Sequence, residues 1–361
     1  MTDAVGVGTV KCLVWDLDNT LWQGTLLEDG EVLLPRRIRD TIVALDERGI
    51  LQSVASKNDP EHAWSRLVAL GVAEYFVLPR IGWQPKSASV REIADELGFA
   101  HHTIAFVDDQ PAERAEVAYH LPDVRCYPAE MLPDLLTLPE FTPDTVTEDS
   151  RQRRRMYQAG VRRVAARDEF AGPDEDFLRS LRMRMEIRVA SEADLARVAE
   201  LTQRTSQMNA TGVHYSGADL RERLADPDQE VLVTTMADRF GPHGAVGVVL
   251  LGRHPGLWHL RLLATSCRVT SFGAGSVILG WLIDQAARAG THLVADFRRT
   301  DRNRVMEIAY RFSGFAEDVC PCETALADAP DVERLHLVPD RRPEPSTMLL
   351  SAPELCVHDS A

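Results

Sequence analysis

Apolar runs and helical patterns alternate over the first 110 residues. The run 10–18 (VKCLVWDLD) is apolar and ends in acids, which is typical of a buried parallel strand with functional residues at its carboxyl end. A helical period follows over 35–49 and stops at a glycine. The alternation continues with apolar runs at 50–56, 76–78 and 104–107 and helical patterns at 60–70 and 86–97. This order predicts an α/β fold with a doubly wound parallel sheet.

The second half alternates as well, with longer strand patterns. Strands are expected at 183–190, 230–238, 244–253, 257–265 and 292–298, and helices at 192–202, 275–289 and 302–312. Because neighbouring strand patterns are joined by turns, we expect an α+β domain around a sheet rich in antiparallel pairs.

A proline-rich stretch separates the two halves. Residues 128–150 carry four prolines and several turn formers, so we place the domain boundary there. The expected organisation is a first domain over 1–130, a linker and brace helix over 131–175, a second domain over 176–326, and a poorly ordered tail over 327–361.

The net charge of −15 over 361 residues limits the possible partners. Nucleic acids and anionic membranes are polyanions, so we expect neither as a partner. The arginine-rich stretch 151–170 is therefore expected to be a solvated helix face or a brace. No apolar run reaches the roughly 18–20 residues that a membrane span needs. The first residues, MTDAVGVGTVK, lack the pattern of a signal peptide, and we expect a cytoplasmic protein.

The cysteines are scattered and are expected to be thiols, not a disulfide framework. They are Cys12, Cys126, Cys267, Cys320, Cys322 and Cys356. Two of them form the short motif Cys320-Pro-Cys322. A zinc site is not expected there, because the sequence around the motif shows no second cysteine pair and no histidine pair.

Two acids directly after the first apolar run suggest phosphoryl chemistry. Asp16 and Asp18 are two positions apart, so on an extended segment both carboxylates would face one crevice at the carboxyl end of the sheet. Two neighbouring negative charges need a cation, which implies Mg²⁺. The first acid can attack phosphorus, and the second can protonate the leaving oxygen and later activate water.

Further polar groups occur at corresponding places along the chain. Ser56 ends the second apolar run, where its hydroxyl can bind a phosphoryl oxygen, and Lys86 opens a helix, where its ammonium can neutralise phosphate and nucleophile. Asp108 and Asp109 end the fourth run and can complete a metal shell. Any one of these acids could simply cap a helix, but the occurrence of all these polar groups at strand ends and helix starts, in one order, favours a phosphoryl-transfer site.

The segments VWDLDNTLW, VASKND, PK and FVDDQPAER, in this order, resemble the haloacid dehalogenase (HAD) superfamily. The resemblance implies Asp16 as nucleophile and Asp18 as general acid and base. It also implies Ser56 and Lys86 as phosphate binders, and a Mg²⁺ site made by Asp16, Asp18, Asp108 and Asp109. Because no cap-sized insertion separates the motifs, the site is expected to be open to a large substrate or covered by the second domain.

A narrower resemblance covers about residues 10–320. WDLDNTLWQGTLLEDG, SKND and VDDQPAER are similar to the FkbH-like branch, which carries a C-terminal acyltransferase-like domain. In the second half, LTQRTSQMNATGVHY (201–215) and TSCRV (265–269) look like that branch. RNRVMEIAYRFSGF (302–315) looks like the closing helix and strand of a GNAT-type acyltransferase.

The resemblance implies a defined reaction. Such proteins take the glyceryl unit of 1,3-bisphosphoglycerate, release phosphate, hold the acyl group as an enzyme thioester and pass it to the phosphopantetheine thiol of an acyl carrier protein. The product feeds a methoxymalonyl-type extender unit, or another three-carbon unit, in polyketide biosynthesis. Cys267 would carry the thioester, and the substrate-binding residues would include Gln203, Asn209, His214, Arg268 and Asn303.

The residues around Cys267 give independent support for a reactive thiol. It lies between a strand and a helix pattern and beside Arg268, and a helix N-terminus and a cation both favour thiolate. The alternative is an ordinary core cysteine. His214 is a candidate base for the thiol if the fold brings the two together.

Three segments depart from the family pattern. They are Ser271–Gly275 in place of a Gly-Arg-Gly turn, Arg261 in place of an acid, and Val213–Tyr215 in place of Arg-Arg-Tyr. Gly273 and Gly275 could still cradle a phosphopantetheine phosphate at a helix start. Two other functions stay open. One is a plain small-molecule phosphatase with a binding domain, and the other is a non-catalytic carrier-protein docking module, which the intact acids and lysine disfavour.

Overall fold

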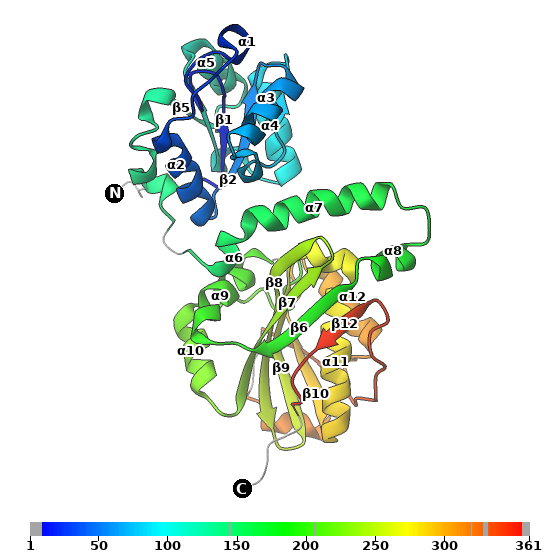
Figure 1. Cartoon of the computed structure of the whole chain (residues 1–361). Coiled ribbons are helices and arrows are strands. Elements are labelled where there is room, and N and C mark those ends of the chain that lie inside the picture. Colours follow the sequence, from blue (N-terminus) through cyan, green and yellow to red (C-terminus); the bar gives the residue numbers. More distant parts are fainter. Residues whose placement is uncertain (1–8, 144–145, 206, 319, 328–330, 356–361) are drawn as a thin grey trace, which may run out of the picture. The chain divides into compact units, whose positions relative to one another are not determined.

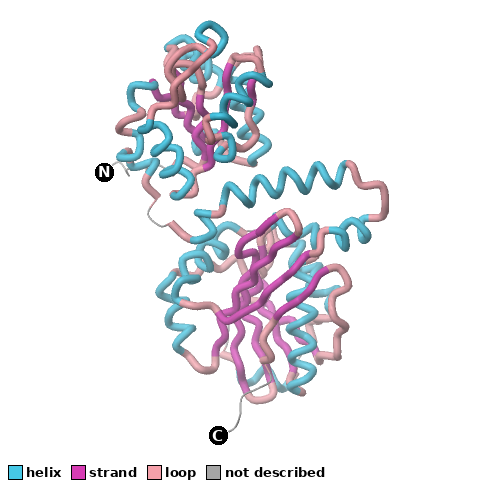
Figure 2. Tube along the Cα trace, in the orientation of Figure 1, coloured by secondary structure: helices cyan, strands magenta, loops and turns pink. Residues whose placement is uncertain are grey.

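The computed structural model describes residues 9–143, 146–205, 207–318, 320–327 and 331–355, so residues 1–8 and Cys356 lie outside the described part (Figure 1). The chain divides into two compact units, 1–161 and 162–361, with the division inside helix α7 (Arg153–Asp168). Each unit has its own sheet (Figure 2). Among the described helices, none is both long and apolar enough to cross a membrane.

Unit 1 is built on a five-stranded parallel sheet of order β3-β2-β1-β4-β5. Its strands are β1 (Cys12–Trp15), β2 (Leu51–Ser56), β3 (Arg80–Ile81), β4 (Ile104–Asp108) and β5 (Arg125–Pro128). Its helices are α1 (Leu26–Asp29), α2 (Arg36–Glu47), α3 (Pro60–Ala69), α4 (Lys86–Leu97), α5 (Pro111–His120) and α6 (Glu148–Arg151). Short 3₁₀ turns are η1 (Ala73–Tyr75), η2 (His101–Thr103), η3 (Ala129–Met131), η4 (Leu135–Thr137) and η5 (Pro139–Phe141).

Alternate residues of β1 feed two separate hydrophobic cores. Leu13 and Trp15 pack with side chains of α2 and α3, whereas Cys12 and Val14 pack with side chains of α4 and α5. Because successive residues of a strand point to opposite faces, a strand covered on both sides reads as a continuous apolar run. The expected doubly wound α/β architecture is confirmed.

The third strand of unit 1 begins four residues later than expected. The run 76–78 forms an isolated bridge at Phe76, and β3 follows at Arg80–Ile81. Leu78 has a φ of 49°, a conformation that ends extended structure, and Pro79 follows it. Local backbone geometry therefore overrides the apolar pattern here.

Unit 2 contains a seven-stranded mixed sheet of order β11-β10-β9-β8-β7-β6-β12. Its strands are β6 (Met183–Val189), β7 (Gln229–Asp238), β8 (Gly241–His254), β9 (Leu257–Thr265), β10 (His292–Phe297), β11 (Glu333–Leu337) and β12 (Met348–Ser351). Its helices are α8 (Asp174–Ser180), α9 (Leu195–Arg204), α10 (Gly217–Ala225), α11 (Ala274–Ala289) and α12 (Arg304–Ser313), with 3₁₀ turns η6 (Glu192–Asp194), η7 (Cys267–Phe272) and η8 (Pro321–Ala325).

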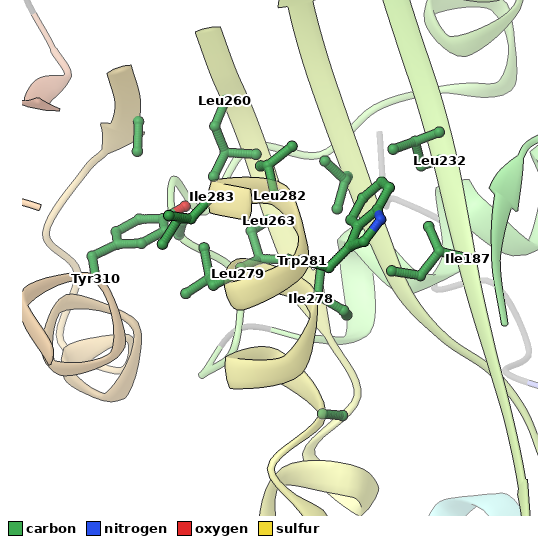
Figure 3. Close-up of a cluster of buried hydrophobic side chains, with 14 of the residues drawn as sticks. Ile187, Leu232, Leu260, Leu263, Ile278, Leu279, Trp281, Leu282, Ile283 and Tyr310 are labelled. Carbon is green, nitrogen blue, oxygen red and sulfur yellow. The ribbon is translucent and has the colours of Figure 1, made fainter. Parts of the chain in front are cut away.

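The sheet of unit 2 carries helices on both faces. Side chains of α11 and α12 pack on one face, where Trp281 lies beside Leu232 and Ile187 of the strands (Figure 3). Side chains of α9 and α10 pack in a second core against β7, β8 and β9. Four of the six strand pairs are antiparallel, and the other two, β9 with β10 and β6 with β12, are parallel. This is the expected α+β arrangement.

The tail over 327–361 does not match the expectation of poor order. Within the described residues it supplies β11, which pairs antiparallel with β10, and β12, which pairs parallel with β6. Its polar composition suggested a solvated segment, but edge strands have one open side and so tolerate polar residues. Long-range pairing therefore decides the structure of this segment.

A short segment fills a gap between two strands of unit 2. β9 and β10 pair only from Leu257–His292 to Leu260–Ala295. Beyond that point the amide of Ala210 donates to Leu263 (3.1 Å), and Arg298 donates to Ala210 (3.1 Å). Residues 208–210, which we call the wedge, thus satisfy backbone groups that the two strands leave unpaired.

Candidate active site

The acids, serine and lysine expected at one edge of the unit 1 sheet come from the elements that meet there. β1 lies between β2 and β4, with Trp15 beside Val54 on one side and Val107 on the other. Asp16 therefore follows β1 next to the last residues of both neighbours, Ser56 and Asp108. Ligands of doubly wound folds bind at this carboxyl edge.

A buried lysine links two of the acids. Lys86 is the first residue of α4, and its Nζ lies 2.8 Å from Oδ1 of Asp16 and also contacts Oδ2 of Asp108. All three side chains are almost fully buried. An ammonium between two carboxylates is arranged to neutralise negative charge that gathers at this point.

Burial shifts the ionisation of these groups. It raises the pKa of Asp16 to about 6, although the Lys86 ammonium acts in the opposite direction. It also raises the pKa of Asp108, again against the effect of Lys86. Burial alone would lower the pKa of Lys86, but the two carboxylates outweigh it and hold this pKa above its ordinary value. The lysine therefore keeps its proton.

The acids have room for a divalent cation. Carboxylate oxygens of Asp16, Asp108 and Asp109 all lie within 4.8 Å of one another. Oδ1 of Asp109 is buried and has no hydrogen-bond partner, which is costly unless something else satisfies it. Three carboxylates with one lysine leave an excess of negative charge, and Mg²⁺ prefers such oxygens. The residues present fit a Mg²⁺ site.

Asp18 lies in a turn and not on an extended strand as the sequence suggested. β1 ends at Trp15, and the carbonyl of Leu17 accepts the amide hydrogens of Thr20 (3.3 Å), Leu21 (2.9 Å) and Trp22 (3.1 Å). The chain turns here, so spacing along a strand does not explain how the two acids are placed. Asp18 is not in the three-carboxylate group, and its part in metal binding stays a prediction.

The carboxylate of Asp18 is held by three donors. Oδ1 accepts from the indole of Trp22 (2.7 Å) and the amide of Leu26 (3.0 Å), and Oδ2 accepts from the side chain of Asn58 (3.0 Å). A carboxylate fixed in this way keeps one orientation, which suits proton transfer at a defined place.

Sequence reasoning missed two residues that hold this geometry. The hydroxyl of Thr20 donates to Oδ2 of Asp16 (3.4 Å) and accepts from the amide of Asp109 (2.9 Å), so it joins the ends of β1 and β4. Asn58, fully buried, orients Asp18. The sequence held two signals for them. Thr20 lies four residues after Asp16, and Asn58 lies two residues after Ser56.

A pocket of about 400 Å³ lies beside the cluster. It is lined by Lys57, Trp83, Pro85, Ala112, Glu113 and Glu116. Pro85 directly precedes the buried lysine, and Ala112 and Glu113 lie in the first turn of α5, which follows Asp108 and Asp109. The pocket is therefore built by the elements that carry the site, and Trp83 at its rim is largely exposed.

Cys267 is an exposed thiol in unit 2. It follows β9, opens the turn η7 and precedes α11, as the sequence predicted. A buried core cysteine is thereby excluded. Gly273, with a φ of 73°, joins η7 to α11, and a Cβ at Gly275 would meet nothing nearer than 3.9 Å. Neither glycine is therefore crowded by other residues at the start of α11.

Asn209 and Asn303 have a different environment from the expected substrate contact. Both are fully buried. The amide of Asn303 donates to the carbonyls of Asn209 (3.0 Å), Ala210 (3.2 Å) and Arg298 (3.0 Å), while Asn209 accepts from the amides of Thr211 and Gly212. Because their polar atoms are used by backbone groups, these residues position the wedge, and no surface is left for substrate.

The other predicted substrate-binding residues of unit 2 are Gln203, His214 and Arg268. Gln203 and His214 are exposed, and Nδ1 of His214 pairs with the carbonyl of Thr202 (2.8 Å). Nε of Arg268 donates to the hydroxyl of Ser266 (3.3 Å) beside the thiol. No interaction found among the described residues joins His214 to Cys267, so its role as base stays a prediction.

Comparisons with known proteins give partial likenesses. No family model and no curated protein matches the chain. Among solved structures, the chain is similar to the N-terminal part, with a phosphatase domain and Mg, of a Bacteroides fragilis protein, at 27% identity and a TM-score of 0.36. The match covers 38% of this chain and 42% of that one, so it spans less than half of that solved N-terminal part.

Two acetyltransferases are also similar. The match to spermidine N-acetyltransferase from Vibrio cholerae, solved with CoA and spermine, has 15% identity and a TM-score of 0.32, and covers 43% of this chain and 96% of that one. The match to PaiA N-acetyltransferase from Thermoplasma acidophilum, solved with coenzyme A, has 14% identity and a TM-score of 0.33. It covers 44% of this chain and 98% of that one.

Proposed function

We propose that the protein is a Mg²⁺-dependent phosphatase of HAD type whose second unit is a GNAT-like acyl-transfer domain, and that it acts as FkbH-like proteins do. The observation that carries the first part is the contact of Lys86 with both Asp16 and Asp108, beside the buried, unpaired oxygen of Asp109. A nucleophilic carboxylate, a fixed ammonium and a cation site at one sheet edge are the parts that phosphoryl transfer needs.

The reaction at Asp16 takes place in two halves. An oxygen of Asp16 attacks phosphorus, the bond from phosphorus to the ester oxygen breaks, and Asp18 gives a proton to that oxygen. In the second half Asp18 takes a proton from water, the water oxygen attacks phosphorus, and the bond to Asp16 breaks to release phosphate. Lys86 stabilises the charge that builds on the phosphoryl oxygens. Bound Mg²⁺ supplies further neutralisation of that charge.

The finer proposal concerns the substrate. A glyceryl unit from 1,3-bisphosphoglycerate must lose two phosphates of different chemistry. The thiolate of Cys267 can attack the acyl carbon, so that a C–S bond forms, the C–O bond to the acyl phosphate breaks and phosphate leaves. The remaining phosphate is an ester, and its removal is the reaction of Asp16. In this proposal unit 2 releases the acyl phosphate, and unit 1 removes the phosphate ester.

The last step passes the acyl group to a carrier. The thiol of a phosphopantetheine arm attacks the thioester carbon, its proton leaves to water or a base, and the Cys267 thiolate is released. The start of α11 at Gly273 and Gly275 is a suitable place for the phosphate of that arm, because helix N-termini bind anions. In this proposal the partner is an acyl carrier protein in polyketide biosynthesis.

A simpler function is the second candidate. His214 pairs with a backbone carbonyl and not with Cys267, so the described residues show no base bonded to the thiol. This favours a small-molecule phosphatase whose second unit binds substrate or partner.

Mass spectrometry separates the two candidates. The full-length protein is incubated with the acyl phosphate and Mg²⁺, and the peptide with Cys267 is searched for a glyceryl adduct. The proposal expects an adduct on Cys267 that disappears when carrier protein is added. Phosphate release without any adduct would favour the simpler function.

A further inference from the structure

Two cysteines and two histidines gather at the far end of β10 from the wedge. The sulfur atoms of Cys320 and Cys322 and one ring nitrogen each of His292 and His336 all lie within 4.8 Å of one another. Three of the four residues are half-buried and His336 is buried. Neither cysteine forms a disulfide. Such a set of nitrogen and sulfur ligands is typical of zinc.

Strand pairing brings the two histidines together. In the β10–β11 ladder, Val294 lies opposite His336. His292 lies two residues before Val294 and so points to the same face of the sheet, where it is the diagonal neighbour of His336. On the opposite face, Leu293, Ala295 and Leu335 pack in the main core, so the histidines face away from α11. The bond of 3.0 Å between Nδ1 of His292 and Nε2 of His336 confirms their approach.

The turn η8 brings the two cysteines over this face. Leu326, at the end of this turn, packs with Leu257 and Val294, and Cys322 lies against the same small cluster. The sulfur of Cys320 lies 3.4 Å from Nδ1 of His292. It also accepts the amide hydrogen of Glu323, a contact that fixes the position of the sulfur in the turn. A cluster of three buried side chains is a small core for a segment of this length.

The distances fit tetrahedral coordination. Bonds of about 2.3 Å to sulfur and 2.0–2.1 Å to nitrogen place two nitrogens about 3.3 Å apart and a nitrogen and a sulfur about 3.5 Å apart around one Zn²⁺. The structure has 3.0 Å for the two histidine nitrogens and 3.4 Å for His292 and Cys320. The atoms are therefore near the separations that an ion would impose.

We propose that these two cysteines and two histidines hold one Zn²⁺ in a closed structural site. Two thiolates balance the charge of the ion and the two imidazoles are neutral, so the site has no net charge, which suits a half-buried place. Four protein ligands leave no position for substrate, so the role is to fix η8 and β11 on the sheet. His292 lies 28 residues before Cys320, and His336 lies 14 residues after Cys322. Because of these long separations, the sequence showed no zinc motif.

The site is separate from the proposed acyl chemistry. His292 pairs with Leu257 at the start of β9, whereas Cys267 follows the end of that strand. The nine residues of β9 separate them by roughly 25–30 Å. The zinc proposal therefore stands or falls independently of the function assigned to Cys267.

Metal analysis of the full-length protein tests the proposal. Protein purified without chelator, or loaded with Zn²⁺ and desalted, should hold one zinc per chain. The double variant C320S/C322S should lose it. The matched control Cys126→Ser should keep it, because that half-buried thiol lies in β5. Asp108→Asn should also keep it, which separates this site from the carboxylate site. Zinc that stays in C320S/C322S, or that is absent from the wild-type protein after loading, would overturn the proposal.

Alkylation of the unmutated protein gives a second test that does not depend on folding of a variant. With zinc, Cys267 should react while Cys320 and Cys322 are protected, and after chelation all three should react. Chelation should also lower the melting temperature by at least about 4 °C, and added Zn²⁺ should restore it. Equal alkylation of Cys320 and Cys322 with and without zinc, or a disulfide between them that takes up no zinc after reduction, would rule the site out.

Discussion

The ammonium nitrogen of Lys86 lies 2.8 Å from Oδ1 of Asp16, and both side chains are almost fully buried. A lone buried carboxylate would be driven towards its neutral form, which is no nucleophile. The lysine opposes this effect and so preserves the reactive form of the acid. Two motifs that lie far apart in the sequence therefore form one reactive pair in the folded protein.

Asp16→Asn should reduce phosphate release by at least ~10³-fold, because it keeps the shape of the side chain but removes the nucleophile. Phosphate release from a simple phosphate ester measures this, with far-ultraviolet circular dichroism as a check on folding. A variant that keeps more than a tenth of the wild-type rate would contradict the assignment.

Lys86→Ala should reduce activity by ~10²-fold or more, since it removes the cation between two buried carboxylates. The matched control is Lys57→Ala. Lys57 pairs with Glu113 (2.7 Å) at a partly exposed place on the pocket rim, and its loss should change the rate much less. Steady-state kinetics of both variants decide the point, and equal losses would mean that the phosphate-binding lysine is wrongly identified.

Activity should require Mg²⁺ and fall when Ca²⁺ replaces it. Calcium is larger and coordinates loosely, so it would spoil the geometry of attack at the three clustered carboxylates. Rates measured in chelator, in Mg²⁺ and in mixtures of both ions test this. Undiminished turnover in excess chelator would argue against a metal at Asp16, Asp108 and Asp109.

Cys267→Ala should abolish transfer to the carrier protein and remove the covalent adduct, while hydrolysis of a simple phosphate ester continues. The acids and lysine all lie within unit 1, so the variant leaves them in place. Mass spectrometry of the carrier protein gives the readout. Normal amounts of glyceryl carrier from the variant would show that the acyl group passes directly from the acyl phosphate to the carrier thiol.

Asn303→Ala should lower the free energy of unfolding by about 2 kcal/mol or more, because it removes a buried side chain that donates to three carbonyls, of which that of Ala210 keeps the amide of Arg298 as a donor. Acyl transfer should fall with it as the wedge loosens, but phosphate release should not. The control is Gln203→Ala, an exposed residue of α9. Denaturant unfolding followed by fluorescence measures the difference, and equal stability of the two variants would refute the positioning role.

Much of the fold follows from local patterns. The strands β1, β2 and β4 are covered on both faces, so their continuous apolar runs predicted them. The helices α2 and α12 are amphipathic, so their helical period predicted them. The acids and Lys86 could be predicted because strand ends and helix starts meet at one edge of a parallel sheet.

The remaining features depend on contacts between distant residues. The turn that redirects Asp18 depends on bonds to the carbonyl of Leu17, and the wedge depends on Asn303, 94 residues from Asn209. The polar strands β11 and β12 are fixed by partners elsewhere in the sheet. Periodicity within a short window holds no information about such pairs.

The two outer strands of the second sheet also bear on how the protein is made. β11 and β12 form the two opposite edges and cover β10 and β6, yet both are synthesised after the strands that they cover. During translation β6 to β10 emerge with both edges bare, and bare edges invite pairing with other chains. The sheet of the first unit has all its strands once Pro128 has been synthesised, whereas that of the second unit has all its strands only at Ser351.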